Sequence, residues 1–457
     1  MTDPVYDMVI LGAGSGGYAA ALRGAQLGLS VALVEADKVG GTCLHRGCVP
    51  TKAVLHAAET VDAVREAGAL GVLATLEGVD MARVNAYKDA IITRMYKGLQ
   101  GLVSSRGIEL VTGWGRLVAP DAVEVNGRRL TGRHVVLASG SYSRTLGQEI
   151  SGPVITSEQA LEMDHVPASA VILGGGVIGV EFASAWASLG TKVTILEGLA
   201  RLVPNEDAAI SKQLERAFRK RKIGFHTSTM FESVDRTASG VTVRTQDGKT
   251  IEAEVMLIAV GRGPATQDLG YEEVGVSMDR GFVLTDEHCR TNVPGVWAVG
   301  DIVPGVQLAH RGFAQGVAVA ERIAGLDPAP VDDVKVPKVT FCEPEIASVG
   351  LSEDQAKEIH GEDAVVTAEF NVAGNARSQI LGTQGFVKLV SLKDGPIVGF
   401  HAIGARMGEQ VGEGQLIVNW EADASDVAAL VHAHPTQNET IGEAAMVLAG
   451  KPLHNHG

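Results

Sequence analysis

Cysteine is scarce in this chain, with four residues among 457. That number excludes the disulfide-dense framework of small secreted domains. Aromatic residues make up only 4 % of the chain and proline 16 positions, so collagen-like, proline-rich and other low-complexity chains are excluded as well. What is left is a globular chain, long enough for about three domains of roughly 150 residues each.

Excess positive charge and long apolar runs are also missing. The formal net charge is −15, which repels a phosphate backbone and excludes general nucleic-acid binding. The longest stretch without a charged residue covers residues 165–180; it is too short for a bilayer span and contains Pro167 and four glycines. No charged leader precedes the apolar run Val5 to Leu11. We therefore expect a cytoplasmic protein that does not enter a membrane.

Glycine, by contrast, is abundant, at 56 positions or roughly 12 % against a usual figure of about 7 %. Part of this excess comes from two segments that match position by position. In both, the acidic residue stands 23 positions after the first glycine, and the glycine that closes the helix stands 16 positions after it. The first segment contains Gly12, Gly14, Gly17, Gly28 and Glu35, and the second contains Gly174, Gly176, Gly179, Gly190 and Glu197.

Each segment reads as a strand, a glycine turn, a helix and a second strand that ends in an acid, which is the dinucleotide-binding fingerprint. The first glycine allows the turn, the second lets the backbone approach a pyrophosphate, and the third lets the helix pack close to the strand. Glu35 and Glu197 stand where a carboxylate accepts hydrogen bonds from ribose hydroxyls and repels a 2′-phosphate. The alternative is that each glutamate merely ends a strand.

The rest of the chain is rich in predicted strands. We expect a hairpin region at 110–125, buried strands at 134–138 and 255–260, and a linker at 327–333, which is rich in proline and acid. Beyond the linker we expect strands at 346–351, 385–391 and 397–403 and helices at 408–421, 426–431 and 439–449. A basic cluster, Arg216, Arg219, Lys220, Arg221 and Lys222, is interpreted as the solvated face of a helix.

Cys43 and Cys48 lie five positions apart, directly after the first glycine unit. In a regular helix this offset separates the Cα atoms by about 7.5 Å, more than the roughly 7 Å that a disulfide permits. A disulfide therefore needs a distorted turn, for which Gly47 is available. Pro50 suits the first turn of a helix predicted at 52–66, whose positive end would lower the pKa of the Cys48 thiol.

Two other interpretations of this cysteine pair stay open. A metal site would need two more ligands at matching spacing, and Cys289 and Cys342 are isolated from each other and from any zinc-type histidine pair. The pair would otherwise be two inert buried thiols, although the flanking glycines suit a packed core poorly. Cys289 and Cys342 themselves are interpreted as structural, and we predict no metal site.

Four more segments carry a resemblance to a known family: GGTCLHRGCVPTK (40–52), TNVPGVWAVGDI (291–302), LAHRGFAQG (308–316) and HAHPTQNE (432–439). With the two glycine units, they make nearly the whole chain similar to the pyridine nucleotide-disulfide oxidoreductases, and most similar to the dihydrolipoamide dehydrogenases among them. The resemblance implies an α/β fold with two Rossmann-like dinucleotide-binding domains, for FAD and NAD, and a C-terminal α+β dimerisation domain. The expected parts are 1–150 (FAD, first part), 151–265 (NAD), 266–335 (FAD and central, second part) and 336–457 (dimerisation).

The resemblance also implies which residues hold the two cofactors. FAD would be bound by Gly12, Gly14, Gly17, Glu35, Gly41, Thr42, Lys52, Gly140, Asp301, Ala309 and His310. NAD would be bound by Gly174, Gly176, Gly179, Glu197 and Gly261. Glu197 favours NAD over NADP, because NADP-using relatives carry basic residues near that strand end.

For the chemistry, the resemblance implies that Cys43 and Cys48 form a redox disulfide. Cys43 would be the exposed interchange sulfur, and Cys48 would face the flavin. Lys52 would lie beside the flavin in an ion pair with Glu181. Departures from the family are His45-Arg46 between the cysteines, where an asparagine-containing pair is commoner, and Ala265 in place of a frequent asparagine.

The resemblance assigns acid/base catalysis to His434, oriented by Glu439 five residues later. Pro435 restricts His434 to an extended backbone, which lets the ring be aimed, and a carboxylate on one ring nitrogen fixes the tautomer of the other. His432 is expected to be structural. In the family this histidine reaches the cysteines of the other subunit, so we expect a homodimer with shared active sites.

The function implied is the reoxidation of dihydrolipoamide to lipoamide with NAD as acceptor. The partners would be a lipoyl-bearing protein and the acyltransferase core of 2-oxo acid dehydrogenase complexes, or a glycine cleavage complex. One alternative is a reductase of another low-molecular-weight disulfide, of the glutathione or mycothione type. A further alternative is a flavin-binding scaffold subunit without turnover.

Overall fold

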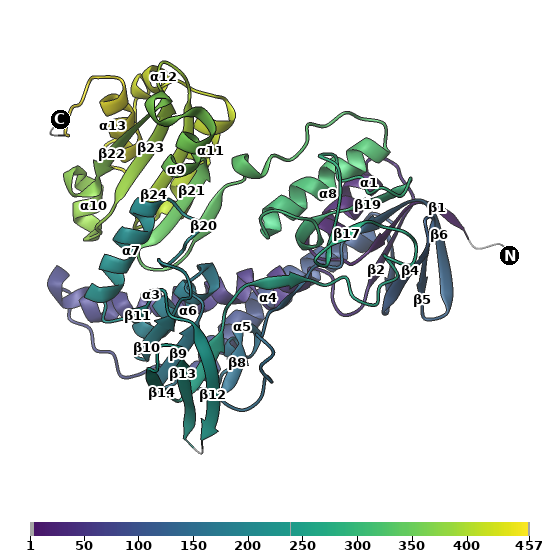
Figure 1. Ribbon diagram of the computed structural model, residues 1–457, viewed down its shortest axis with the longest axis horizontal. Coiled ribbons are helices and arrows are strands. Elements are labelled where there is room, and N and C mark those ends of the chain that lie inside the picture. Colours follow the sequence, from purple (N-terminus) through teal and green to yellow (C-terminus); the bar gives the residue numbers. More distant parts are fainter. Residues whose placement is uncertain (1–3, 238, 456–457) are drawn as a thin grey trace.

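The computed structural model describes residues 4–237 and 239–455. In Figure 1 they form a first α/β unit on the right, a second one at the lower centre and a C-terminal unit at the upper left. The chain leaves the first unit after its sixth strand, builds the second unit, and then returns to the first sheet with one more strand. The first unit is therefore made of two separate stretches of sequence.

The first unit is organised around a sheet with the strand order β3-β2-β1-β6-β5-β4, in which β19 also pairs with β6. The parallel strands are β1 (Val5–Leu11), β2 (Val31–Glu35), β3 (Glu109–Thr112), β6 (Arg128–Leu137) and β19 (Val296–Ala298), and the antiparallel hairpin is β4 (Gly115–Ala119) and β5 (Ala122–Val125). Helix α1 (Ser15–Gln26) packs on β1 and β2, and α8 (Ala309–Ile323) packs on α1. The central strands are buried because helices cover them, as parallel sheets require.

The second unit has a five-stranded parallel sheet in the order β11-β10-β9-β15-β8. Its strands are β8 (Val154–Thr156), β9 (Ser169–Leu173), β10 (Lys192–Leu196), β11 (Gly224–His226) and β15 (Val255–Ile258), and its helices are α5 (Ser157–Ala160), α6 (Val177–Leu189) and α7 (Ala208–Lys220). A separate antiparallel sheet consists of β12 (Phe231–Thr237), β13 (Gly240–Thr245) and β14 (Thr250–Ala253). Short pairs, β7 (Ser141–Ser143) with β16 (Arg262–Pro264) and β17 (Met278–Asp279) with β18 (Phe282–Val283), lie in the connections.

The C-terminal unit has an antiparallel sheet in the order β20-β21-β24-β23-β22. Its strands are β20 (Lys338–Thr340), β21 (Glu345–Gly350), β22 (Val365–Asn371), β23 (Phe386–Leu392) and β24 (Ile397–Gly404), and its helices are α9 (Glu353–His360), α10 (Ala376–Leu381), α11 (Met407–Asn419), α12 (Ala424–Ala428) and α13 (Glu439–Leu448). Helices α11 and α13 pack on this sheet, and their apolar residues share one core with its strands.

Three helices connect the units: α2 (Gly41–His45), α3 (Cys48–Glu66) and α4 (Met81–Ser105). Helix α3 runs from the first unit to the second and packs along α6. The contact is apolar on one side, where Val54, Leu55 and Ala58 of α3 share a core with Phe182 and Ala183 of α6. Within the ranges 4–237 and 239–455, no helix is both long and apolar enough to cross a bilayer.

The predicted strands and helices of the C-terminal region are present within a few residues, because their apolar alternation and helical spacing are local signals. Two predictions need correction. Residues 110–125 are not one hairpin, because β3 pairs in parallel with β2 and only β4 and β5 form a hairpin. The helix predicted at 52–66 begins at Cys48 instead.

Candidate active site

The carboxyl ends of three strands bring together residues that are predicted to bind FAD. Leu11 at the end of β1 is in register with Leu137 of β6, and Leu137 is in register with Ala298 of β19. Because parallel strands end at the same edge of a sheet, the segments that follow them meet there. Gly12, Gly140 and Asp301 therefore lie in segments that leave one edge of the first sheet, although they are far apart in sequence.

The first glycine turn has the geometry that its sequence predicts. Gly12 has φ of +104°, and a Cβ on it would lie 2.3 Å from the carbonyl oxygen of Ala138. A Cβ on Gly17 would lie 1.8 Å from the carbonyl oxygen of Gly12. Gly14 differs, because a Cβ there would meet nothing within 4 Å. Gly14 is also the N-cap of α1, so its open side gives an anion access to the first turn of that helix.

The second glycine turn repeats these values. Gly174 has φ of +100°, and a Cβ on it would lie 2.4 Å from the carbonyl oxygen of Ala259. A Cβ on Gly179 would lie 1.9 Å from the carbonyl oxygen of Gly174, while one on Gly176 would again meet nothing within 4 Å. Both turns thus have the open cradle that a dinucleotide pyrophosphate needs.

The two strand-end glutamates are held against these turns. The backbone N–H of Ala13 donates to Glu35 Oε2 at 2.8 Å, and the N–H of Gly175 donates to Glu197 Oε2 at 2.6 Å. The other oxygen of each carboxylate accepts an N–H from two residues further on, at 2.9 Å for Glu35 and 2.7 Å for Glu197. Each glutamate therefore presents a fixed carboxylate beside its glycine turn, which is more than ending a strand.

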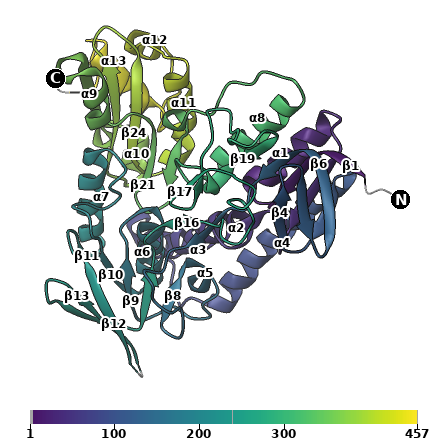
Figure 2. The same cartoon turned by 45° about the vertical axis from the view of Figure 1, so that its right-hand side comes forward.

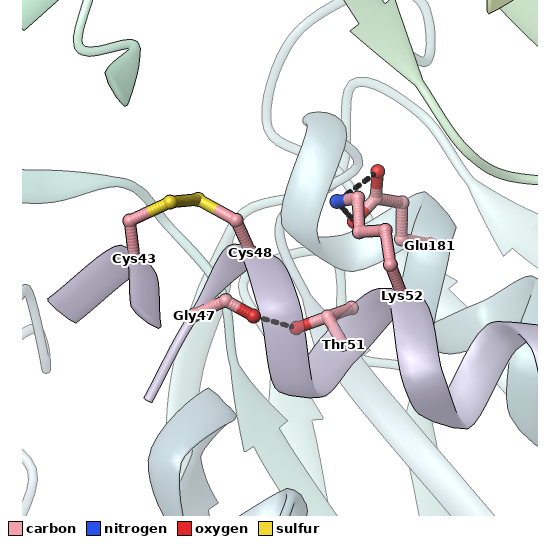
Figure 3. The surroundings of a disulfide bond; sticks show 6 residues. All are labelled: Cys43, Gly47, Cys48, Thr51, Lys52 and Glu181. Atoms are coloured by element: carbon pink, nitrogen blue, oxygen red, sulfur yellow. Dashed lines mark hydrogen bonds and ion pairs between the residues drawn. A yellow bond between two sulfur atoms is a disulfide. The ribbon is translucent and has the colours of Figure 1, made fainter. Parts of the chain in front are cut away.

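Cys43 and Cys48 form a disulfide with their Cα atoms 4.6 Å apart. Figure 3 shows Cys43 on α2 and Cys48 as the first residue of α3, with the helical geometry interrupted at Gly47 between the two helices. The break brings the Cα atoms closer than a continuous helix would. The disulfide rules out the metal site and the pair of inert thiols as interpretations of these two residues.

The exposure of the two cysteines within one chain differs from the prediction. Cys48 is exposed, whereas Cys43, expected to be the exposed interchange sulfur, is half-buried. Two residues that depart from the family hold the loop between them. His45 Nε2 is hydrogen-bonded to the carbonyl oxygen of Val39 at 2.9 Å, and Arg46 forms an ion pair with Asp37.

Lys52 lies one helical turn after Cys48 and joins α3 to the second unit. Its Nζ lies 2.9 and 2.8 Å from the two carboxylate oxygens of Glu181 on α6 (Figure 3). Glu181 is buried, with 4 % of its side chain exposed, and also accepts the backbone N–H of Phe341 at 2.9 Å. The ring of Phe341 lies 4.8 Å from Lys52 Nζ. One carboxylate thus links the disulfide helix, the second unit and the start of the C-terminal unit.

His434 and Glu439 form the hydrogen-bonded pair that the resemblance implies. His434 Nδ1 lies 2.7 Å from Glu439 Oε1, and the second oxygen accepts the N–H of Thr436 at 2.8 Å. Burial raises the pKa of Glu439, but the bonds from Thr436 and His434 outweigh it and lower the pKa below its ordinary value. Glu439 therefore stays ionised and can orient the imidazole.

This pair does not approach the cysteines of its own chain. Figure 2 shows α13, which begins at Glu439, in the C-terminal unit and well apart from α2. The His434 side chain is 72 % exposed. A histidine presented to solvent in this way can act on a disulfide only if another protein surface brings that disulfide to it.

Several residues that are predicted to bind FAD have contacts that explain their positions. Asp301 Oδ2 accepts the hydroxyl of Ser141 at 2.5 Å. A Cβ on Gly41 would lie 2.7 Å from Gly14 Cα, so the segment with Thr42 starts directly on the glycine turn. Ala309 and His310 begin α8, and His310 Nε2 is hydrogen-bonded to the carbonyl oxygen of Pro337 at 2.7 Å.

Sequence reasoning missed two residues that hold this edge. Gln315 is buried, and its Oε1 accepts the N–H of Gly300 at 2.8 Å, which fixes the turn carrying Asp301. Arg262 Nε donates to Ser141 Oγ at 2.7 Å. Both belong to segments that the sequence singled out, and Gly261 beside Arg262 has φ of +102°. Only the fold shows that their side chains meet the strand ends.

The interpretation of the basic cluster is wrong for Arg221. Its guanidinium turns inward, with 20 % of the side chain exposed, and donates to Ser184 Oγ at 2.6 Å and Ser188 Oγ at 2.6 Å on α6. It also donates to the carbonyl oxygen of Glu343 at 2.9 Å and lies 3.5 Å from Asp62 of α3. The reason is that Arg221 follows the last residue of α7 and is free to reach back across the unit boundary.

Comparisons with known proteins agree with this arrangement. A family model described as pyridine nucleotide-disulphide oxidoreductase matches residues 6–316, and the model of its dimerisation domain matches residues 336–445. The chain is 38 % identical to a dihydrolipoyl dehydrogenase of Bacillus subtilis over 98 % of this chain and 99 % of that protein. It is 36 % identical to the mitochondrial dihydrolipoyl dehydrogenase of Pisum sativum, covering 98 % and 92 %.

Among solved structures, the crystal structure of LpdA from Mycobacterium tuberculosis superposes with a TM-score of 0.90 at 27 % identity, over 96 % of this chain and 99 % of that one. Two Rossmann-like units and a C-terminal α+β unit are thus shared along the whole length. With both glycine cradles, the disulfide and these matches in agreement, the chain belongs to the pyridine nucleotide-disulphide oxidoreductase family and is an FAD-dependent oxidoreductase that uses NAD.

Proposed function

We propose that this protein oxidises protein-bound dihydrolipoyl groups to lipoyl groups with NAD as acceptor. The observation that carries the proposal is the Cys43–Cys48 disulfide at the start of α3, one turn before a lysine that is paired with the second nucleotide-binding unit. For the substrate, the support is that dihydrolipoyl dehydrogenases match this chain over nearly their whole length.

The residues present fit both cofactors. The first turn and the strand-end segments with Gly140 and Asp301 would hold FAD, together with Gly41, Thr42, Ala309 and His310. The second turn, with Glu197 and Gly261, would hold NAD. When bound, FAD would supply the chemistry that passes two electrons from a protein dithiol to a nicotinamide.

Side chains of the protein, not the cofactors, carry out the thiol chemistry. His434 accepts the proton of one dihydrolipoyl thiol, and the thiolate attacks the sulfur of Cys43. The Cys43–Cys48 bond breaks, and Cys48 leaves as a thiolate, which the N-terminal end of α3 stabilises. The second dihydrolipoyl thiol then attacks the substrate sulfur of the mixed disulfide and its proton passes to the departing Cys43 sulfur, so the substrate is oxidised to its cyclic disulfide and the protein pair is reduced.

We further propose a homodimer in which His434 of one protomer serves the disulfide of the other. The match to a dimerisation domain supports two copies, and the exposed, pre-oriented imidazole supports the exchange between them. The partners would be a lipoyl-bearing protein and the acyltransferase core of a 2-oxo acid dehydrogenase or glycine cleavage complex. We propose that the protein works in the cytoplasm.

The test measures NADH formation from dihydrolipoamide by the purified, FAD-loaded protein, and compares it with turnover of glutathione disulfide and mycothiol disulfide. We expect activity with dihydrolipoamide and a loss of at least about 1000-fold in Cys43→Ser, Cys48→Ser and His434→Gln, since each removes an essential step. Cys289→Ala is the matched control, because burial raises the pKa of that thiol to about 12 and keeps it unreactive. A preference for another disulfide, or full activity in either serine variant, would overturn the proposal.

A further inference from the structure

Two residues before His434, a second histidine faces the opposite way. The His432 side chain is 12 % exposed, whereas that of His434 is 72 % exposed. His432 Nε2 lies 2.7 Å from Oε1 of Glu413 on α11. The segment thus contains two histidine–glutamate pairs, one turned to solvent and one turned into the C-terminal unit.

Glu413 holds both ends of the segment that carries the exposed pair. Its second oxygen, Oε2, accepts the side-chain N–H of Asn438 at 2.7 Å. Asn438 directly precedes Glu439, and His432 precedes His434 by two residues. A single carboxylate on α11 therefore ties the chain on either side of the His434–Glu439 pair, and any shift of Glu413 is transmitted to both members.

The rest of the segment leaves the His432 ring little room. A Cβ on Gly442 of α13 would lie 2.7 Å from His432 Nδ1, so α13 passes directly against the ring. The carbonyl oxygen of Thr436 accepts the side-chain N–H of Asn375 at 3.0 Å, and Gln437 donates to the carbonyl oxygen of Ala405 at 2.8 Å. Because these positions are fixed so closely, the orientation of His434 depends on the His432–Glu413 pair.

We propose that His432 and Glu413 are positioning residues for the acid/base step, and that they set the orientation of His434 through the 432–439 segment. This inference rests on the proposed role of His434. It replaces the expectation that His432 is only structural.

The charges around His432 strengthen its bond to Glu413. The titratable groups that face it are Glu413 of α11 and Glu439 of α13. The hydrogen bond to Glu413 raises the pKa of His432 against the opposing effect of burial, and Glu439 adds to the rise. A charge-assisted bond of this kind holds the ring more firmly than a neutral contact would.

The test compares kcat and KM for dihydrolipoamide across pH in His432→Gln, Glu413→Gln and the double variant. Glutamine can still donate a hydrogen bond to Glu413 but cannot carry a charge. In His432→Gln we therefore expect a smaller fall in kcat than in Glu413→Gln, with KM unchanged, because a bond to Glu413 is kept. In the double variant, kcat should fall no further than in Glu413→Gln, because both residues act through the same contact.

The loss of positioning should appear in kcat rather than KM. We expect Glu413→Gln to lower kcat about tenfold with little change in KM, because the substrate contacts are intact and only the base is misaligned. The control is His360→Gln, the same substitution at an exposed residue at the end of α9. It should leave both constants and the pH profile as in the wild type.

Three outcomes would overturn the inference. One is a His432→Gln profile equal to that of His360→Gln. Another is a fall in kcat in the double variant that equals the product of the two single falls, and a third is a fall in kcat that only follows lost flavin content or a lower Tm. If wild-type protein is inactive with dihydrolipoamide, or if His434→Gln is fully active, the proposed function fails first and the inference fails with it. An active wild type with an inactive His434→Gln variant confines the failure to the inference.

Discussion

Helices α1 and α6 begin at the same glycine fingerprint but connect their turns to different parts of the molecule. The outer face of α1 is made of very small residues, and α8 lies directly on it (Figure 1). A Cβ on Gly316 of α8 would lie 2.2 Å from the carbonyl oxygen of Gly16 on α1. The outer face of α6 instead carries Glu181, Ser184 and Ser188, all buried and all within one helical stripe.

The difference shows how one motif serves two purposes. Backbone contact between α1 and α8 brings the segment of Asp301, Ala309 and His310 to the first turn, so the two stretches of the first unit form one site. Polar contacts from α6 reach α3 and the 341–343 segment, so the second turn is linked to the disulfide helix. The glycines allow a dinucleotide to bind, and the outer face of the helix determines which other segments contact that binding site.

The largest effect that tests this comparison comes from the third glycine of each turn. In Gly17→Ala the new Cβ would lie 1.8 Å from a carbonyl oxygen, and in Gly179→Ala 1.9 Å. We expect Gly17→Ala to purify without flavin, and Gly179→Ala to keep its flavin while its KM for NADH rises by about 100-fold or more. Flavin absorbance and NADH kinetics measure these effects.

Gly14→Ala and Gly176→Ala are the matched controls for the fold, because a Cβ at either position would meet nothing within 4 Å. Both should keep the wild-type Tm in the cofactor-free form. A Gly179→Ala variant that loses its flavin together with its nicotinamide binding would show that the two turns are not separable.

An intermediate effect comes from Arg221, whose guanidinium contacts α6, α3 and the C-terminal unit. In Arg221→Met we expect the free energy of unfolding to fall by about 2–3 kcal/mol, because buried hydrogen-bond acceptors lose a charged donor. Urea or thermal unfolding measures the change. Arg216→Met is the control, since Arg216 is exposed on α7, which ends just before Arg221. Equal stability in the two variants would contradict the junction described for Arg221.

The smallest effect comes from the strand-end glutamates, where both units are alike. Glu35→Gln should weaken FAD binding about tenfold and leave the KM for NADH unchanged, because only one carboxylate charge beside a ribose is removed. Glu197→Gln should raise the KM for NADH and leave FAD binding unchanged. It should also narrow the difference in KM between NADH and NADPH. Equilibrium dialysis of flavin and initial rates with both nicotinamides check this. Loss of FAD in Glu197→Gln would go against the assignment of the second turn.

Features that depend on short stretches of chain could be predicted from the sequence. The two glycine turns, the distorted link between Cys43 and Cys48, and the contact between His434 and Glu439 each lie within a few residues or within one strand-turn-helix unit. The bond between Lys52 and Glu181, 129 residues apart, was expected only from the resemblance. Gln315, Arg262 and the inward turn of Arg221 were missed, because nothing local marks a side chain that reaches another unit.

By itself the sequence determined that the chain has two dinucleotide-binding turns and a cysteine pair close to a helix, and the resemblance added a histidine held by a nearby carboxylate. Backbone sterics at glycine and hydrogen bonds over a few residues are enough for that. Only the tertiary structure decided which strand ends share an edge, which helix face meets which neighbour, and that His434 points away from its own disulfide. Those outcomes depend on the packing of segments more than a hundred residues apart, which no local pattern encodes.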